Sequence, residues 1–182
     1  MLKKVCQIFV GSLLSLGIMI ISMVIICTAG CTKVAGYHVT IDHSQRLEHM
    51  ISAGRYDWTN GDITVEHFPL TGSGQIDINL ELLRCNQAIR TEDVLREIDV
   101  RGYRPATITE LLAFGADEQT EALQRQYIII APGSVWQSLD GRQYVPGLTS
   151  LASKRCLYLD WLGSAWLEKS LVLAVRKSRS TS

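Results

Sequence analysis

The sequence predicts an α+β protein in which one globular domain follows an apolar N-terminal segment. Residues 5–29 contain no charged side chain, and the next part of the chain has helix-type apolar spacing between start and stop signals. The last part has short apolar or alternating runs separated by turn residues, as antiparallel strands have. Early helices followed by a meander of antiparallel strands are typical of the α+β class. We therefore divide the chain into an N-terminal segment, 1–35, a globular domain, 36–177, and a disordered tail, 178–182.

The N-terminal segment has the composition of a membrane anchor. Lys3 and Lys4 precede the charge-free run, which is longer than the apolar core of most signal peptides. A helix rises about 1.5 Å per residue, so residues 5–29 can cross the roughly 30 Å hydrocarbon layer of a bilayer. The two lysines favour a cytoplasmic N-terminus. We expect the membrane to be a partner through residues 5–29, with the domain outside the cytoplasm.

Two alternatives stay open for this segment. The residues Thr28-Ala29-Gly30-Cys31 resemble the end of a bacterial lipoprotein signal, which implies lipidation of Cys31. Thr28 departs from that pattern, which has an aliphatic residue in its place. In the other alternative the start of the chain is misassigned, and the protein is cytoplasmic.

Cysteines and charges narrow the possible functions. The predicted domain contains Cys85 and Cys156, which form either a disulfide in an oxidising compartment or two buried thiols. The 18 basic and 18 acidic side chains balance, so the chain has no electrostatic signature of a nucleic-acid-binding protein.

The first elements of the domain are predicted from periodicity and turn residues. We expect a strand at 37–42, a helix capped by Ser44 and ended by Gly54, strands at 63–65 and 76–80, and a second helix that is capped by Thr91 and ends before Gly102.

The next helix has the clearest signals. Thr107 and Glu110 have the spacing of a capping box, and Gly115 is placed to end the helix. Pro105 disfavours helical geometry at Arg104, so the chain reaches this helix from an extended segment.

Strands are expected after this helix. We predict a buried strand at 127–131, a hairpin over 135–145 that turns at Asp140-Gly141, and strands at 156–161 and 171–176.

Arg104, Thr107 and Glu110 carry a resemblance to a known family. Their Arg-x-x-Thr-x-x-Glu spacing is similar to that of C-type-lectin-like domains of the formylglycine-generating-enzyme and bacterial-adhesin kind, in which such a segment enters the second helix. Ala174-Val175-Arg176 resembles the end of the last strand of these domains. The resemblance covers residues 101–177 and implies a single C-type-lectin-like domain.

A second resemblance covers residues 37–177. The stretches "AGRYDWTNGDIT", "RPATITELLAFGA", "GSVW" and "LAVRK" are similar to those of a group of small bacterial proteins, a likeness that implies no activity. The chain departs from the formylglycine-generating enzymes because Cys156 stands alone where they have a cysteine pair. It also lacks the Glu-Pro-Asn or Gln-Pro-Asp loop and the Trp-Asn-Asp of calcium-dependent lectins.

No strong catalytic or metal-binding motif is present in the sequence. The histidines lack His-Glu-x-x-His spacing, and Gly133-Ser134-Val135 lacks the second glycine of a nucleophile elbow. Cys156 has aliphatic neighbours and no base that the sequence positions beside it. We expect no catalytic residue, no metal and no cofactor.

Aromatic residues are the best candidates for a binding surface. Trp136, Tyr144, Trp161 and Trp166 include residues in predicted turns, where rigid rings favour recognition. Arg104 is the fifth candidate, and it either pins the start of the helix or contacts a ligand. We interpret the protein as a non-catalytic, membrane-tethered binding or structural module with a protein or glycan ligand. The alternatives are an enzyme on the same fold that uses Cys156, and a cytoplasmic protein with a misassigned start.

Overall fold

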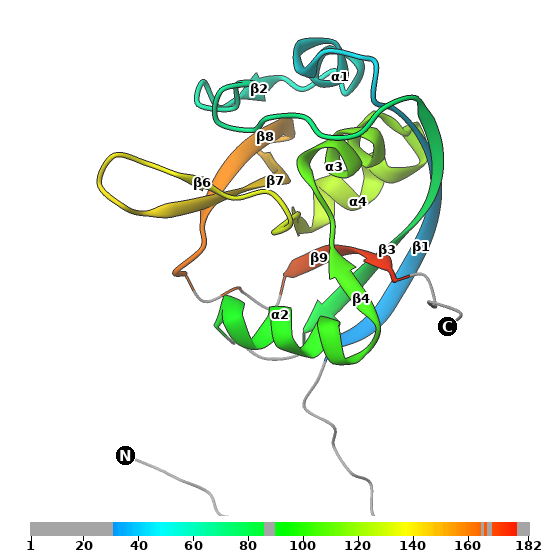
Figure 1. The fold of residues 1–182 in the computed structure, drawn as a ribbon, viewed down its shortest axis with the longest axis vertical. Helices are drawn as coiled ribbons and strands as arrows, with labels where there is room; N and C mark the ends of the chain where they lie inside the picture. Colours follow the sequence, from blue (N-terminus) through cyan, green and yellow to red (C-terminus); the bar gives the residue numbers. More distant parts are fainter. Residues whose placement is uncertain (1–30, 86–89, 165, 167–168, 178–182) are drawn as a thin grey trace, which may run out of the picture.

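The computed structural model describes residues 31–85, 90–164, 166 and 169–177. Within these residues the α+β class is confirmed, because the chain forms four α-helices and one mixed nine-stranded sheet (Figure 1). The predicted anchor at 5–29 and the predicted tail at 178–182 lie outside the described residues. In the part that is described, no helix combines the length and the apolar character needed to cross a bilayer.

The sheet has the strand order β1-β3-β9-β5-β7-β8-β2, with β4 paired to β9 and β6 paired to β7 beside this path. In chain order the strands are β1 Cys31–Asp42, β2 Trp58–Thr59, β3 Gln75–Cys85, β4 Tyr103–Pro105, β5 Ile128–Ile130, β6 Trp136–Gln137, β7 Gln143–Leu151, β8 Lys154–Trp161 and β9 Ser170–Arg176.

The expected order of early helices and a late antiparallel meander is only partly correct. The two longest strands, β1 and β3, belong to the early part of the domain and pair with each other antiparallel. Among the late strands β5, β7 and β8 are antiparallel neighbours, but β5 pairs with β9 in parallel, as does β2 with β8. β1 also begins at Cys31, so the predicted domain boundary at residue 36 falls inside this strand.

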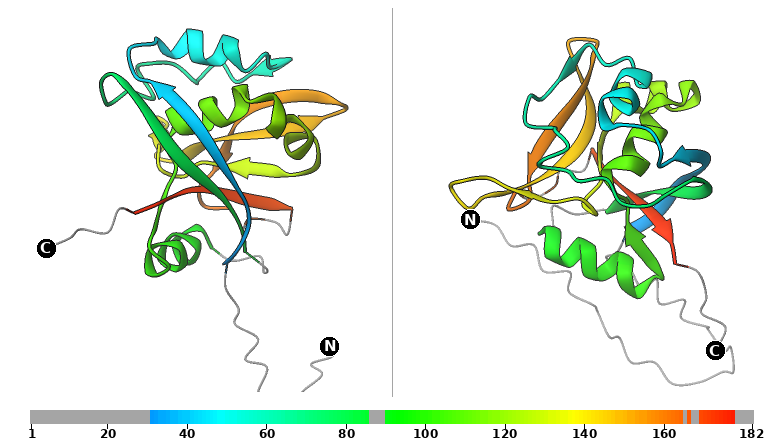
Figure 2. Two further views of the ribbon diagram at one scale, coloured as in Figure 1. Left: turned by 90° about the vertical axis from the view of Figure 1, so that its right-hand side faces the viewer. Right: turned by 45° about the horizontal axis from the view of Figure 1, so that its top comes forward.

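Helices cover both faces of the sheet (Figures 1 and 2). They are α1 Leu47–Ala53, α2 Thr91–Val100, α3 Ile108–Ala116 and α4 Glu121–Gln126, with a 3₁₀ turn at Glu118–Thr120 before α4. α1 and α3 share the larger apolar core with one face, through residues such as Met50 and Leu112. α2 covers the other face with Val94 and Ile98.

β9 lies between these two cores. Leu171, Leu173 and Val175 pack into the core under α1 and α3, whereas Val172 and Ala174 pack into the core under α2. Side chains alternate between the faces of a strand, so a strand covered on both sides must be apolar throughout. This explains the uninterrupted apolar run that predicts a strand at 171–176.

α3 starts as predicted but does not end at Gly115. Its capping box is present, and the Glu110 carboxylate accepts the Thr107 backbone N–H at 2.7 Å. Gly115 is buried inside the last turn, and the helix continues to Ala116. A Cβ at Gly115 would lie 1.9 Å from the Tyr56 hydroxyl oxygen, so close packing, rather than a left-handed conformation, explains this glycine.

Three other local predictions are corrected. Ser44 does not cap α1, because its hydroxyl donates to Asp42 and the helix begins after Arg46. Thr91 is the first residue of α2 and donates its hydroxyl to the Leu162 carbonyl. Residues 63–65 form turns instead of a strand.

Candidate functional site

Three of the five predicted binding residues lie in one row across the sheet. Trp136 of β6 is opposite Tyr144 of β7, and Tyr144 is opposite Trp161 of β8. Residues directly opposite each other on antiparallel strands point to the same face. The ring centroids of Trp136 and Tyr144 are 5.6 Å apart. These two rings are half-buried, and Trp161 is 48% exposed, so the row leads from the edge of the core into solvent.

The hairpin between β6 and β7 presents this row and protrudes from the body of the molecule (Figure 1). Gly141, with φ of 82°, adopts the left-handed conformation that closes such a turn. The Asp140 carboxylate accepts hydrogen bonds from the Ser138 hydroxyl and from the Arg142 backbone N–H. These bonds hold the pKa of Asp140 below its usual value, and the bond from the Ser138 hydroxyl has the largest effect. The turn predicted at Asp140-Gly141 is therefore confirmed.

A loop over residues 60–68 supplies the opposite wall. β2 pairs with β8 just before this loop, and the Asn60 N–H donates to the Leu157 carbonyl at 2.9 Å. Asn60 Oδ1 accepts the Asp62 N–H at 2.9 Å, a side-chain bond that favours a turn over the predicted strand. Ile63 and Phe68 are buried and fix the loop to the core. Asp62 and His67 are thereby placed next to Trp136.

The hairpin and the loop border a shallow, solvent-open hollow of about 720 Å³, which we call the aromatic hollow. Its lining consists of Asn60, Asp62, His67, Trp136, Ser138, Leu139, Asp140, Tyr144 and Leu159. The His67 ring stacks on Trp136 with centroids 4.4 Å apart. His67 Nδ1 is 2.8 Å from the Asp62 carbonyl oxygen. A carbonyl only accepts, so Nδ1 carries the hydrogen, and Nε2 of the neutral ring is an acceptor.

The other two predicted binding residues lie elsewhere. Trp166 is 4% exposed and packs in the core under α2. Arg104 makes a bidentate ion pair with Glu110, at 2.6 and 3.0 Å, and so pins the start of α3. This pair raises the pKa of Arg104 further above its ordinary value. Trp166 and Arg104 therefore do not belong to the aromatic hollow.

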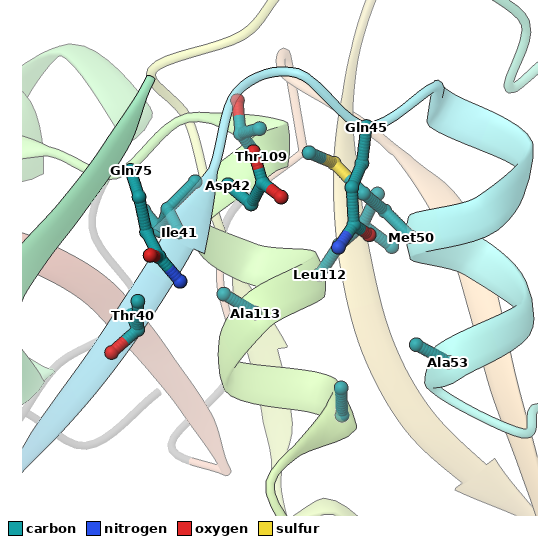
Figure 3. Close-up of a pocket in the computed structure, with 11 residues that line it drawn as sticks. Thr40, Ile41, Asp42, Gln45, Met50, Ala53, Gln75, Thr109, Leu112 and Ala113 are labelled. Carbon is teal, nitrogen blue, oxygen red and sulfur yellow. The ribbon is translucent and has the colours of Figure 1, made fainter. Parts of the chain in front are cut away.

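A second hollow, of about 260 Å³, lies between α1, α3 and the end of β1 (Figure 3). Thr40 and Gln75 lie on one side of it, Gln45 lies beside Met50 on the other, and Met50 and Leu112 belong to its apolar part. The Asp42 carboxylate accepts two hydrogen bonds from Ser44, which lower its pKa. The Asp42 carboxylate thus stabilises the turn at Ser44. Unlike the aromatic hollow, this second hollow has no aromatic residue among the described residues that line it.

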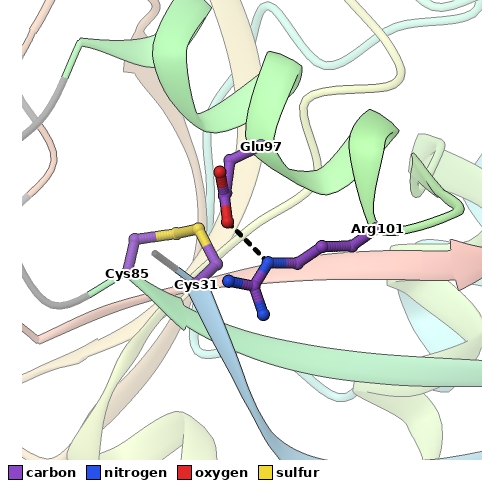
Figure 4. Close-up of a disulfide and its surroundings, with 4 residues drawn as sticks. All are labelled: Cys31, Cys85, Glu97 and Arg101. Carbon is purple, nitrogen blue, oxygen red and sulfur yellow. Dashed lines mark hydrogen bonds and ion pairs between the residues drawn. A yellow bond between two sulfur atoms is a disulfide. The ribbon is translucent and has the colours of Figure 1, made fainter. Parts of the chain in front are cut away.

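Cys31, the lipidation site of the lipoprotein alternative, forms a disulfide with Cys85 (Figure 4). The two residues are opposite each other in the β1–β3 ladder, with Cα atoms 4.0 Å apart. Both are buried under α2, near Glu97 and Arg101. A sulfur in a disulfide cannot also carry a thioether-linked lipid. Because Cys85 pairs with Cys31, the pairing that the sequence left open between Cys85 and Cys156 is wrong.

The two candidate nucleophiles, Cys156 and Ser134, take part in hydrogen bonds within the fold. Cys156 is a free thiol, 8% exposed, that donates weakly to the Lys154 carbonyl at 3.5 Å. Ser134 Oγ accepts the Ile108 N–H at 2.9 Å, which satisfies a donor at the start of α3. Within the described residues no group of histidine, cysteine and acidic side chains is arranged to hold a metal ion.

Sequence reasoning missed the wall formed by Asn60, Asp62 and His67. The turn residues Asn60-Gly61-Asp62 are a usable signal for a loop. Nothing local to the sequence shows that this loop packs beside a hairpin more than 70 residues later, because the parallel β2–β8 pairing and the stacking of His67 on Trp136 join segments distant in sequence. Comparisons of the chain with family models, curated proteins and solved structures found no match.

Proposed function

We propose that the protein is a non-catalytic binding module, held at the membrane by residues 5–29, whose ligand site is the aromatic hollow. The observation that carries this proposal is the pair Trp136–Tyr144, which lines an open hollow, while Trp161 lies beside Tyr144 in the same row but outside the lining. Concave sites with aromatic walls and a few polar groups are typical of small-ligand recognition. The ligand is a glycan or a segment of another protein.

The finer fold assignment, a C-type-lectin-like domain, belongs to this proposal. It is supported by Ala174-Val175-Arg176, which ends the last strand, and by the segment from Arg104 to Glu110, which leads from an extended stretch into a helix, although this is the third described helix and not the second. A location outside the cytoplasm is supported by the Cys31–Cys85 disulfide, because structural disulfides form and persist in oxidising compartments.

A thermal-shift screen of the full chain in detergent micelles tests the site. A panel of glycans and short peptides is added, and a bound ligand raises the melting temperature in a saturable way. We expect the Trp136→Ala variant to lose this response. Trp58→Ala is the matched control, because Trp58 is 51% exposed on β2 and does not line the hollow. A response that Trp136→Ala retains, or that Trp58→Ala loses, contradicts the assigned site.

A further inference from the structure

We infer that the aromatic hollow selects an organic cation, that is, an ammonium, quaternary ammonium or guanidinium group attached to an apolar body. This inference rests on the proposed function, because it names the ligand class of the same site. Three independent properties of the lining support it: its charge, its hydrogen-bonding groups and the state of its aromatic faces.

The charge of the lining is negative. Asp62 and Asp140 contribute carboxylates, and no lysine or arginine lines the hollow. Arg142 is nearby, but its Nε is 3.4 Å from Asp140 and its guanidinium leans over the Trp161 ring, outside the hollow. Among the described residues, no side chain forms a hydrogen bond or ion pair with the Asp62 carboxylate. An incoming cation would therefore be attracted without first displacing an internal partner of Asp62.

The hydrogen-bonding groups of the lining include acceptors on Asp62, Asp140 and His67, together with donors on Asn60, Trp136 and Tyr144. The two carboxylates only accept, and Nε2 of His67 is an acceptor in the tautomer that carries its hydrogen on Nδ1. The Ser138 hydroxyl donates to Asp140, so its hydrogen is not free for a ligand. A neutral sugar must both donate and accept through each hydroxyl, whereas an ammonium or guanidinium group only donates. The acceptors on Asp62, Asp140 and His67 thus provide partners for the N–H groups of a cation.

Several aromatic rings of this molecule already have an arginine side chain over one face. Four guanidinium groups lie over rings in the described residues, in the pairs Arg84–Tyr127, Arg142–Trp161, Arg155–Tyr56 and Arg176–Tyr103. Trp161, at the outer end of the row, is one of these rings. In the same part of the chain, Trp136 and Tyr144 have no such cation. Tryptophan and tyrosine bind cations well. Because the His67 ring covers one face of Trp136, with centroids 4.4 Å apart, the inner binding position is formed by Tyr144 and the remaining face of Trp136.

The test uses two matched pairs of probes that differ in charge. Choline is compared with its neutral analogue 3,3-dimethylbutan-1-ol, and glucosamine with N-acetylglucosamine. The full chain in micelles carries ¹⁵N-labelled tryptophan, and the indole N–H signals report binding at each ring. We expect the Trp136 signal to shift with the cation of at least one pair, about tenfold more tightly than with its neutral partner. The Trp58 signal should not move. The responding pair distinguishes a quaternary amine from an amino sugar.

Variants separate this inference from the proposed function. Asp62→Asn should weaken cation binding about threefold and leave the neutral probes unchanged, and about 0.5 M NaCl should act in the same direction. Asp93→Asn removes an exposed carboxylate on α2 and is the matched control. Equal affinity for charged and neutral probes would overturn the cation inference while the site stands. The inference also fails if no probe shifts Trp136. Cation binding that persists in Trp136→Ala would overturn the site itself, and with it the proposed function.

Discussion

Gly115 shows how a single residue can be fixed by a contact that is distant in sequence. Tyr56 lies against two glycines, because a Cβ at Gly54 would come within 2.3 Å of its ring and one at Gly115 within 1.9 Å of its hydroxyl. Leu148 is also 3.0 Å from the Gly115 position. We expect Gly115→Ala to lower the free energy of unfolding by about 1–3 kcal/mol, as overpacking of a dense core does. Chemical denaturation of the purified protein measures this loss.

Two variants decide whether Tyr56 is the cause. Gly61→Ala is the control, since a Cβ there has no atom within 4 Å, and it should cost little. The Tyr56 hydroxyl is buried without a hydrogen-bond partner in the described structure, so Tyr56→Phe should itself be neutral or stabilising. In the Gly115→Ala background it should recover part of the lost stability. No recovery would show that Leu148 or the helix backbone, rather than Tyr56, limits the space.

Asp160 predicts a dependence of stability on pH. Burial raises its pKa above the ordinary aspartate value of 3.8, and hydrogen bonds from the Trp161 backbone, Tyr158 and Ser164 only partly oppose this. The folded state therefore binds more protons than the unfolded state above pH 3.8, and the free energy of unfolding falls as pH rises through the raised pKa.

The variant Asp160→Asn removes this ionisation. It should be more stable than the natural protein at pH 7, and the difference should disappear below pH 3.8, where both states of Asp160 are protonated. Denaturation curves at several pH values measure the effect, with Asp62→Asn as an exposed control. A stability gain that is equal at all pH values would mean that packing, and not ionisation, is responsible.

At the level of elements, the β1–β3 pair depends on the Cys31–Cys85 disulfide at its end. The bond joins residues 54 apart, and in the chain-entropy description it stabilises the fold by about 4 kcal/mol. We expect a reductant to lower the melting temperature by about 10 °C. The double variant Cys31→Ser/Cys85→Ser should melt at the lower temperature with or without reductant. Cys156→Ala should keep the reductant-dependent loss, because Cys156 is a free thiol.

The elements also show how far the sequence alone can predict this structure. Local signals located the start of α3, the turn at Asp140-Gly141 and the buried strands β5 and β9. They failed for residues 63–65, where Ile63 is buried in the core from a loop and Val65 is exposed, and for Gly115, whose lack of a side chain is explained by contact with a tyrosine in another segment. For the site, the sequence nominated the aromatic row but not its opposite wall. Strand pairing and packing between distant segments decide these features, and neither is encoded in a short window of sequence.

At the scale of the whole molecule, Cys31 connects the apolar segment to the folded domain. It directly follows Gly30 in the sequence, it begins β1, and its sulfur bonds to Cys85. The anchor and lipoprotein alternatives therefore require different chemistry at the same atom. In the anchor alternative two thiols lose two electrons and two protons to a disulfide donor of the compartment. In the lipoprotein alternative the same sulfur forms a thioether, and Cys85 keeps a free thiol.

Mass spectrometry distinguishes the anchor alternative from the lipoprotein alternative. The full chain is recovered from membranes with its free thiols blocked and without reduction. Trypsin cleaves after Lys4, Lys33, Arg84 and Arg90, so a disulfide-bonded anchor should yield the peptide 5–33 joined to the peptide 85–90. We expect this joined species, and reduction should release its two halves. The Cys85→Ser variant should yield 5–33 with a blocked thiol at Cys31, which controls for adventitious pairing. A peptide that begins at a lipid-modified Cys31, together with a blocked thiol at Cys85, would mean that the N-terminal segment is cleaved and that β1 is held to β3 by hydrogen bonds and packing alone.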